Sequence, residues 1–182
     1  KNTIIDVESE IQIASINNQN HDKAIMLTDD TKSSILDIKG VKNIHPIISK
    51  PCIININNNL EGVILKGIDS TYKKELINNR IIDGEYMQND HDILISKQQS
   101  KKLNLQTGEK CLLYFVSKNN NIQKRKFTIR GIYDMKNEKF NEFYVLAKKE
   151  YLEKINNGEK DHTSHYEVEI NSLTDLEKIE KQ

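Results

Sequence analysis

Two histidines have the spacing of metal ligands. His162 and His165 form a His-x-x-His pair, but they lie in a polar stretch without cysteine, and only Asp161 adjoins them. Metal sites in proteins usually take three or four such side chains. We therefore interpret this pair as part of a surface loop and expect no bound metal.

A short acidic segment, Asp90-His91-Asp92, could serve in general acid–base chemistry. Its position before an apolar β-rich run favours a polar turn instead. Ser33 and Ser34 lack the Gly-x-Ser-x-Gly context of a nucleophile elbow. We therefore expect no catalytic residue in either segment.

Two glycines, Gly62 and Gly67, flank the segment Val-Ile-Leu-Lys, but no glycine-rich phosphate loop is present. Asp29 and Asp30 are typical of the acidic first turn of a helix, where they complement the helix dipole. The sequence therefore predicts a chain without cofactor or enzymatic activity of its own.

Cys52 and Cys111 are the two cysteines, and each lies in an apolar run predicted to be a strand. This context favours two buried free thiols. A disulfide would require the two strands to be adjacent, which the sequence does not show.

The central stretch, residues 92–134, is predicted to contain a strand, a short helix and two further strands. The helix is expected to begin at Ser96, which forms a capping box with Gln99. Lys101 and Lys102 fall in its last turn, where positive charge suits the dipole. Strands are expected at Lys110–Val116 and Lys124–Asp134, joined by a polar loop.

The flanking parts alternate strands and helices. Strands are expected at residues 5–13, 41–56 (broken or bulged at its two prolines), 60–68, 143–146 and 166–170, with a turn at 83–85. Helices are expected after Asp30 or Thr31, at 72–77, at 150–155 (ending by Gly158) and from Ser172 onward. This order predicts an α+β fold, with residues 1–68 plus 139–182 as one part and 69–138 as an inserted β-rich part.

The charges of the chain balance: 27 lysines and arginines face 27 aspartates and glutamates. This balance argues against nucleic acid as a partner. No apolar run approaches the ~20 residues of a membrane helix. The chain begins at Lys1 without an initiator methionine, and we expect it to be part of a longer protein.

A basic cluster, Lys124-Arg125-Lys126, lies on the predicted hairpin. A solvated face explains it, and a partner contact is the alternative. If the hairpin contacts a partner, the residues expected to do so are those of its loop and adjoining strand: Lys118, Asn119, Asn120, Lys124 and Arg125.

Several segments occur in an order found in one protein family. These segments are residues 10–13, 40–48, 62–69 (GVILKGID), 92–113, 127–132 and 144–147. In this order the chain resembles the extracytoplasmic domain of FtsX-like ABC-transporter permeases, close to the lipoprotein-releasing LolC/LolE type and to MacB. Ser96, Gln98-Gln99 and Glu109 depart from the usual pattern. The loop 117–123 is short and lacks proline, where the LolC type has a longer hook that engages a periplasmic carrier.

The resemblance implies a porter-like α/β subdomain with an inserted strand-rich, sabre-like subdomain. It also implies a parent permease in the inner membrane with four membrane helices, this domain lying on the periplasmic side between the first two. The implied partners are a cytoplasmic ATP-binding subunit, a second permease copy or homologue, and a lipoprotein or a periplasmic carrier or adaptor protein.

Three alternatives to lipoprotein release stay open from the sequence. They are a MacB-like efflux or signal-relay permease, a free-standing secreted protein-binding module, and a hydrolase that uses His91 or Asp92.

Overall fold

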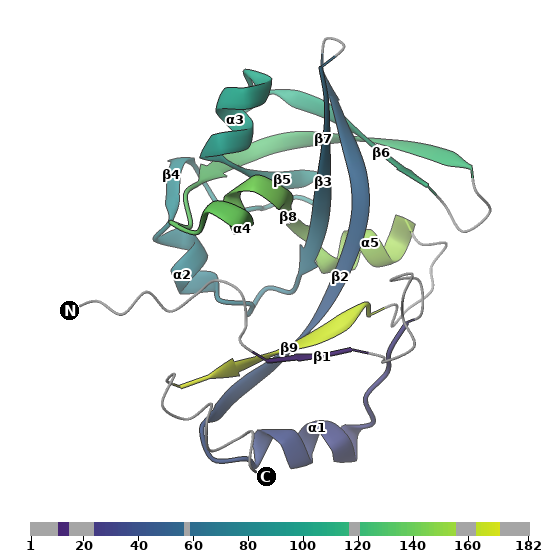
Figure 1. Ribbon diagram of the computed structural model, residues 1–182, viewed down its shortest axis with the longest axis vertical. Coiled ribbons are helices and arrows are strands. Elements are labelled where there is room, and N and C mark those ends of the chain that lie inside the picture. The colour runs from purple at the N-terminus through teal and green to yellow at the C-terminus, as the bar shows by residue number, and fades with distance from the viewer. Residues whose placement is uncertain (1–10, 15–23, 57–58, 117–120, 156–162, 172–182) are drawn as a thin grey trace.

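The structure is a computed structural model of the 182-residue chain, and it describes residues 11–14, 24–56, 59–116, 121–155 and 163–171 (Figure 1). The strands are β1 (Ile11–Ile13), β2 (Val41–Ile56), β3 (Asn59–Ile68), β4 (Ile81–Gly84), β5 (Asp92–Ser96), β6 (Lys110–Val116), β7 (Ile122–Tyr133), β8 (Tyr144–Lys148) and β9 (His165–Ile170). The helices are α1 (Asp29–Leu36), α2 (Lys74–Asn78), α3 (Lys97–Leu103), α4 (Glu138–Phe143) and α5 (Lys149–Ile155).

The strands close into a barrel. Pairing runs from β2 to β3, β8, β5, β7 and β6, and β6 pairs again with β2, so the ring is complete. The remaining strands extend the sheet: β4 pairs with β7, and β9 and β1 continue from β2. The predicted α+β class is thus confirmed, with a closed barrel that the sequence did not indicate.

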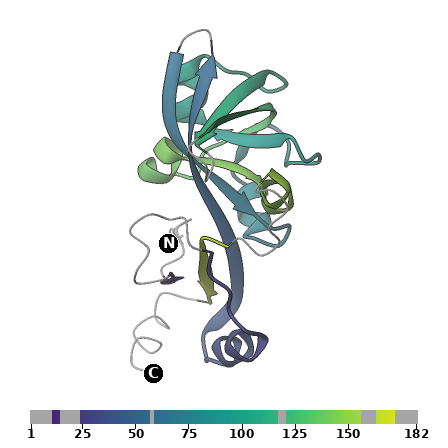
Figure 2. The ribbon, with the colours of Figure 1, turned by 90° about the vertical axis from the view of Figure 1, so that its right-hand side faces the viewer.

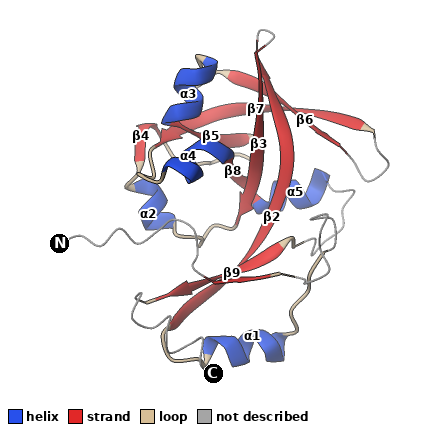
Figure 3. Cartoon of the chain, in the orientation of Figure 1, coloured by secondary structure: helices blue, strands red, loops and turns tan. Residues whose placement is uncertain are grey.

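The long strand β2 belongs to two layers. Its first half pairs with β9 in a small outer sheet that also contains β1, and its second half pairs with β3 in the barrel. Figure 2 shows this strand running from the outer sheet into the barrel, and Figure 3 shows α1 along the side of the outer sheet away from the barrel. The outer sheet and the barrel are therefore joined through one continuous strand.

The prolines of β2 do not break it, contrary to the expected interruption. Pro46 pairs with a residue of β9 and Pro51 with a residue of β3, while the one register shift of the β2–β9 pairing lies between Val41 and Asn43. At each proline β2 has a strand partner on one side only. A proline is tolerated there because its missing N–H removes no ladder hydrogen bond on the open side.

Two apolar clusters hold the barrel. Ile93 and Ile95 of β5 point into the barrel interior, whereas Leu94 between them joins a second cluster on the outer side, with Phe140 of α4 and Tyr72. Strand β5 is therefore buried on both faces. This explains why its three central residues, 93–95, are all apolar and do not alternate with polar residues.

Local signals predicted some helix ends correctly. The Ser96–Gln99 capping box is present at the start of α3. The cap of α1 was wrong: Thr28 accepts the hydrogen bond from the Thr31 N–H, ahead of the expected Asp30 or Thr31. The helix expected from Ser172 onward lies outside the described residues.

Two short elements were missed. Strand β4 occupies the segment expected to be only a turn, and α4 begins after Asn137, whose side chain accepts from the Phe140 N–H. Both elements are too short to show a period in sequence. Tertiary contacts with β7 and with the outer cluster stabilise them.

Candidate functional site: a buried ionic junction and a hairpin

A lysine and a glutamate are fully buried where the outer sheet meets the barrel. Lys66 of β3 and Glu167 of β9 have side chains only 2 % exposed, and the Lys66 Nζ lies 2.7 Å from the Glu167 Oε1. The Tyr72 hydroxyl completes a triangle: it accepts from the Lys66 Nζ at 2.8 Å and donates to the Glu167 Oε2 at 2.7 Å. This triangle links the barrel to β9 by charge-assisted hydrogen bonds.

Aromatic rings surround the ammonium group. The Lys66 Nζ lies 4.9 Å from the ring centroid of Tyr72, 5.3 Å from that of Phe140 and 5.2 Å from that of Tyr144. Such cation–π contacts partly replace the water that the ammonium loses on burial. The lysine is therefore held as a cation within an otherwise apolar cluster.

The charge state of this group is fixed near neutral pH. Burial by itself raises the pKa of Glu167, but the hydrogen bond from His165 and the charge of Lys66 outweigh it and hold the pKa well below its usual range. Burial and the Glu167 charge raise the pKa of the Tyr72 phenol far above 10. Tyr72 is thus a protonated donor, unsuited to act as a general base.

A second ionic group adjoins the first. The fully buried His45 of β2 has its Nε2 3.2 Å from the Glu169 Oε2 and its Nδ1 3.6 Å from the Asp69 Oδ2. Lys42 also binds Glu169, with its Nζ 2.7 Å from the Oε1. Glu169 comes from β9 and Asp69 from the turn after β3, so this group again joins the outer sheet to the barrel.

Alternation along β9 places its two glutamates on one face. Glu167 and Glu169 point to the barrel side, while Tyr166 and Val168 belong to the other face, where the Leu27 N–H donates to the Tyr166 hydroxyl at 3.3 Å. The face of β9 that a period-2 pattern marks as polar is therefore covered by the barrel.

The segment LKGID supplies most of the barrel side of this junction. Lys66 provides the cation, and Asp69 Oδ1 accepts from the backbone N–H groups of Thr71 at 2.8 Å and Tyr72 at 2.9 Å. Gly67 lies between them against α5, where an added Cβ would be 2.6 Å from the Leu152 Cδ1. Gly67 is thus required by close packing and not by a positive φ.

We name residues 42, 45, 66, 69, 72, 167 and 169 the junction. Apart from the exposed Lys42, its members are buried or partly buried, and they are paired with one another, so the arrangement supports a structural link between the outer sheet and the barrel. In the sequence, LKGID is visible only as part of the family pattern. A lysine inside an apolar strand indicates a buried charge, but its partner Glu167 lies 101 residues away in the chain.

The β6–β7 hairpin carries the predicted partner-contact residues. Lys124 is exposed and pairs with Tyr114, whose other neighbour across the sheet is the exposed Ile53 of β2. Arg125 points to the opposite face, because side chains alternate along the strand, and its Nη1 donates to the Lys124 carbonyl at 3.0 Å.

The remaining predicted contacts, Lys118, Asn119 and Asn120, lie outside the described residues. The structure therefore places Lys124 and Arg125 on two faces of the hairpin, and a contact of the five residues with a partner stays a prediction.

The Asp90-His91-Asp92 segment has the predicted role of a polar turn. Asp90 pairs with Lys154 at 2.6 Å, and the His91 ring packs edge-on against Tyr151, with centroids 4.5 Å apart. Asp92 is buried, and its Oδ2 accepts from two backbone N–H groups of the preceding turn, at 2.9 and 2.7 Å.

The two cysteines are free and buried, as predicted. Burial raises the pKa of both the Cys52 and the Cys111 thiol to about 12. Of the two histidines with ligand-like spacing, His162 lies outside the described residues, and the His165 Nε2 is 3.2 Å from the Glu167 Oε1. Within the described ranges no group of three or more histidine, cysteine, aspartate or glutamate side chains is arranged so that it could hold a metal ion.

A shallow groove of about 310 Å³ lies beside β4, lined among others by Gly84, Thr107 and Arg130. The Arg130 guanidinium in it is paired with Glu85, and the Thr107 hydroxyl donates to Asp83. The charge of Arg130 is thus neutralised by Glu85 within the fold, which favours a structural role for this arginine.

No protein-family model matches the chain. In sequence, the chain is 28 % identical over 148 residues to the lipoprotein-releasing system transmembrane protein LolC of Buchnera aphidicola, covering 77 % of this chain and 37 % of that protein. The chain therefore spans just over a third of the length of this curated relative.

Two solved structures share the fold. The extracellular domain of the noncanonic ABC-type transporter YknZ from Gram-positive bacteria has a TM-score of 0.57 and 14 % identity, covering 92 % of this chain and 88 % of that one. The periplasmic region of MacB from Actinobacillus actinomycetemcomitans has a TM-score of 0.57 and 13 % identity, covering 92 % and 78 %. The resemblance predicted from the sequence motifs is thereby confirmed: the chain has the fold of the extracytoplasmic domain of MacB-like and FtsX-like ABC permeases and is a distant relative of LolC.

Proposed function

We propose that this chain is the extracytoplasmic domain of an ABC-transporter permease that couples cytoplasmic ATP hydrolysis to the release of lipoproteins from the inner membrane. The observation that carries this proposal is the sequence match to LolC over 148 residues, supported by a fold that domains of MacB and YknZ share. The chain itself would be non-catalytic, and ATP would be hydrolysed on a separate subunit.

Under this proposal the domain acts mechanically. None of the helices in the described ranges is long and apolar enough to cross a membrane. Movement would therefore reach the domain from membrane helices elsewhere in the parent protein, in the inner membrane. A closed barrel fastened to an outer sheet by buried ion pairs suits this task, because it moves as a body.

We further propose that residues 1–68 plus 139–182 and residues 69–138 correspond to the porter-like and sabre-like parts of such domains. Each part supplies one contiguous half of the barrel, since β2, β3 and β8 come from the first and β5, β7 and β6 from the second. The two parts would then share one hydrogen-bonded ring.

The β6–β7 hairpin is the proposed contact with a lipoprotein or with a carrier or adaptor protein. Its outer face presents a row across three strands, with the partly buried Tyr114 between the exposed Ile53 and Lys124, and Ile122 near the hairpin end is 75 % exposed. Exposed apolar side chains beside a lysine fit a partner with an acidic, partly apolar surface.

The test of this function is purification of the tagged full-length gene product from its own cells in mild detergent. Recovery with a cytoplasmic ATP-binding subunit, a second permease and a lipoprotein would support the proposal. Recovery with an efflux adaptor protein in place of lipoproteins would favour the MacB-like alternative. Recovery in the soluble extracytoplasmic fraction without an ATPase would contradict the transporter proposal and leave a binding module.

The hairpin is tested in the same preparation by Lys124→Glu, with Lys102→Glu on α3 as the matched surface control. We expect the hairpin variant to lose the extracytoplasmic partner while retaining the ATP-binding subunit. Equal recovery of that partner by both variants would contradict the hairpin assignment.

A further inference from the structure

The buried histidine of the junction faces two carboxylates from different layers. The His45 ring, fully buried, has the Glu169 carboxylate at its Nε2 (3.2 Å) and the Asp69 carboxylate toward its Nδ1 (3.6 Å). Within the described part of the chain the Nδ1 makes no hydrogen bond. Its edge packs on Tyr72, with ring centroids 5.2 Å apart at 81°.

Both carboxylates are fixed by other groups. Asp69 Oδ1 is held by the backbone N–H groups of Thr71 and Tyr72, and Glu169 Oε1 is held by Lys42. Neither carboxylate can therefore turn away easily when the charge of the ring changes. The ring must adapt to two anions that the fold has already placed.

A protonated and a neutral imidazole differ in what they can offer here. The imidazolium has an N–H on each nitrogen and can donate toward both carboxylates, whereas a neutral ring has one N–H and turns a lone pair toward the other carboxylate. A lone pair facing an anion inside a protein is unfavourable, because no water screens it.

We propose that His45 is a proton-operated latch that holds the outer sheet of β1 and β9 against the barrel. The protonated ring bridges Glu169 of β9 to Asp69 of the barrel side. Loss of the proton removes one of the two connections and loosens β9 from the barrel, while the barrel ring itself stays paired. This property belongs to the chain and does not depend on the transport proposal.

Among His45, Asp69 and Glu169, His45 is the group that changes its charge near neutral pH. Burial lowers the pKa of His45, but the adjacent Asp69 and Glu169 carboxylates favour the cationic ring, outweigh burial and raise the pKa above 6.5. Burial by itself raises the pKa values of Asp69 and Glu169, but both are lowered on balance: His45 and Thr71 lower the pKa of Asp69, and Lys42 and His45 lower that of Glu169.

The other groups around the ring keep their charge in this range. The hydrogen bond and charge of Glu169 raise the pKa of Lys42, and Tyr72 remains protonated. Beyond Tyr72 lies the Lys66–Glu167 pair, which His165 also contacts.

The sign follows from linkage. A group whose pKa is raised by folding contributes stability that is complete below its unfolded pKa of ~6.5 and is lost as the pH rises through its folded value. The latch is therefore closed in mildly acidic medium and loosens as the medium becomes alkaline. Each unit by which the pKa is raised corresponds to about a tenfold loss of latch stability.

Native-state amide hydrogen exchange of the 182-residue chain between pH 5.5 and 8.5, corrected for intrinsic exchange rates, tests the latch. We expect amides of β9 to lose protection relative to those of β5 and β7 as the pH rises, about tenfold per unit of raised pKa. His45→Gln should abolish this step. His91→Gln, which changes an exposed histidine that packs against Tyr151 and is not part of the junction, should retain it.

A second measurement keeps the test decisive if His45→Gln fails to fold. Titration of the His45 imidazole by NMR should give a pKa above 6.5, and Glu169→Gln should lower it and shift the exchange step to lower pH. The proposal is overturned if His45 titrates at or below 6.5, or if β9 and the barrel lose protection together. A step that survives His45→Gln but disappears in His165→Gln would also overturn it.

Discussion

Replacement of Lys66 by methionine should destabilise the fold more than any surface charge change. Methionine has a similar length and fills the same space between the aromatic rings, so the change removes the charge and leaves the packing nearly intact. The Glu167 carboxylate, 2 % exposed, then keeps its uncharged partner Tyr72 and the nearby His165 but loses the ammonium group of Lys66. A buried carboxylate that has lost its lysine is the source of the expected cost.

The magnitude follows from the burial of the pair. Removing one partner of a buried ion pair costs about 3–5 kcal/mol, and a domain of this size has a total stability of about 5–15 kcal/mol. Lys66→Met should therefore remove a large share of the free energy of unfolding. Lys66→Met/Glu167→Gln should cost less than the sum of the single changes, since no charge is left buried in the double variant.

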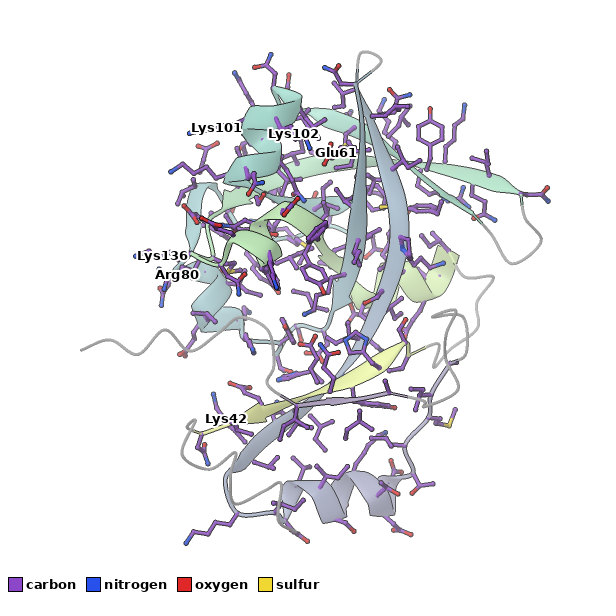
Figure 4. The ribbon with its side chains drawn as sticks, in the orientation of Figure 1. Lys42, Glu61, Arg80, Lys101, Lys102 and Lys136 are labelled. Atoms are coloured by element: carbon purple, nitrogen blue, oxygen red, sulfur yellow. The ribbon has the colours of Figure 1, made fainter. Side chains whose placement is uncertain are left out.

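The assay is urea unfolding at pH 7 and pH 4, with Lys102→Met as the control. Lys102 and Glu61 have the same 2.7 Å separation, but the Lys102 side chain is 58 % exposed (Figure 4), so this change should cost at most about 1 kcal/mol. The low pKa of Glu167 means that the pair stabilises the fold above pH ~4.5 and less as the pH falls. The Lys66→Met deficit should thus be smaller at pH 4. Equal costs for the two methionine variants at pH 7 would refute the reasoning.

Three further changes test other parts of the fold. Gly67→Val should lower the free energy of unfolding by about 1–3 kcal/mol in urea, because the added Cβ would overlap α5. Gly62→Ala is the control, since no atom lies within 4 Å of its added Cβ and no overlap arises. Similar losses of stability in both variants would contradict the packing argument. Ser96→Ala should lower the free energy of unfolding by about 1 kcal/mol through loss of the α3 cap, and an unchanged value would show that the cap contributes nothing. Cys52 and Cys111 should react with iodoacetamide at pH 8 only on unfolding, because burial raises both thiol pKa values to about 12; rapid labelling of the native chain would contradict their burial.

Local sequence signals predicted the parts of the fold that depend on neighbours in the chain. The capping box at Ser96, the strand before it and the free, buried cysteines required only short-range patterns, and all are present. The missed elements, β4 and α4, are too short to carry a period. They exist because β7 and the outer apolar cluster provide partners for them.

The family motifs include the residues of the barrel side of the junction but do not indicate that these residues form a buried ionic group. GVILKGID was recognised as a pattern, yet the functions of Lys66, Gly67 and Asp69 depend on β9, α5 and β2. Nothing within the motif indicates that its lysine is buried or names the glutamate that neutralises it.

The sequence by itself determined which residues alternate along each strand, where α3 begins, and that the chain lacks the motifs of catalysis. Only the tertiary structure decided that β6 returns to β2 to close the barrel, and that the polar face of β9 turns toward Lys66 and His45. The physical reason is that a period of two separates the two faces of a strand but does not show what covers each face. From the sequence alone a charged face of a strand is expected to be solvated, and only the tertiary structure shows whether another layer of the fold buries it.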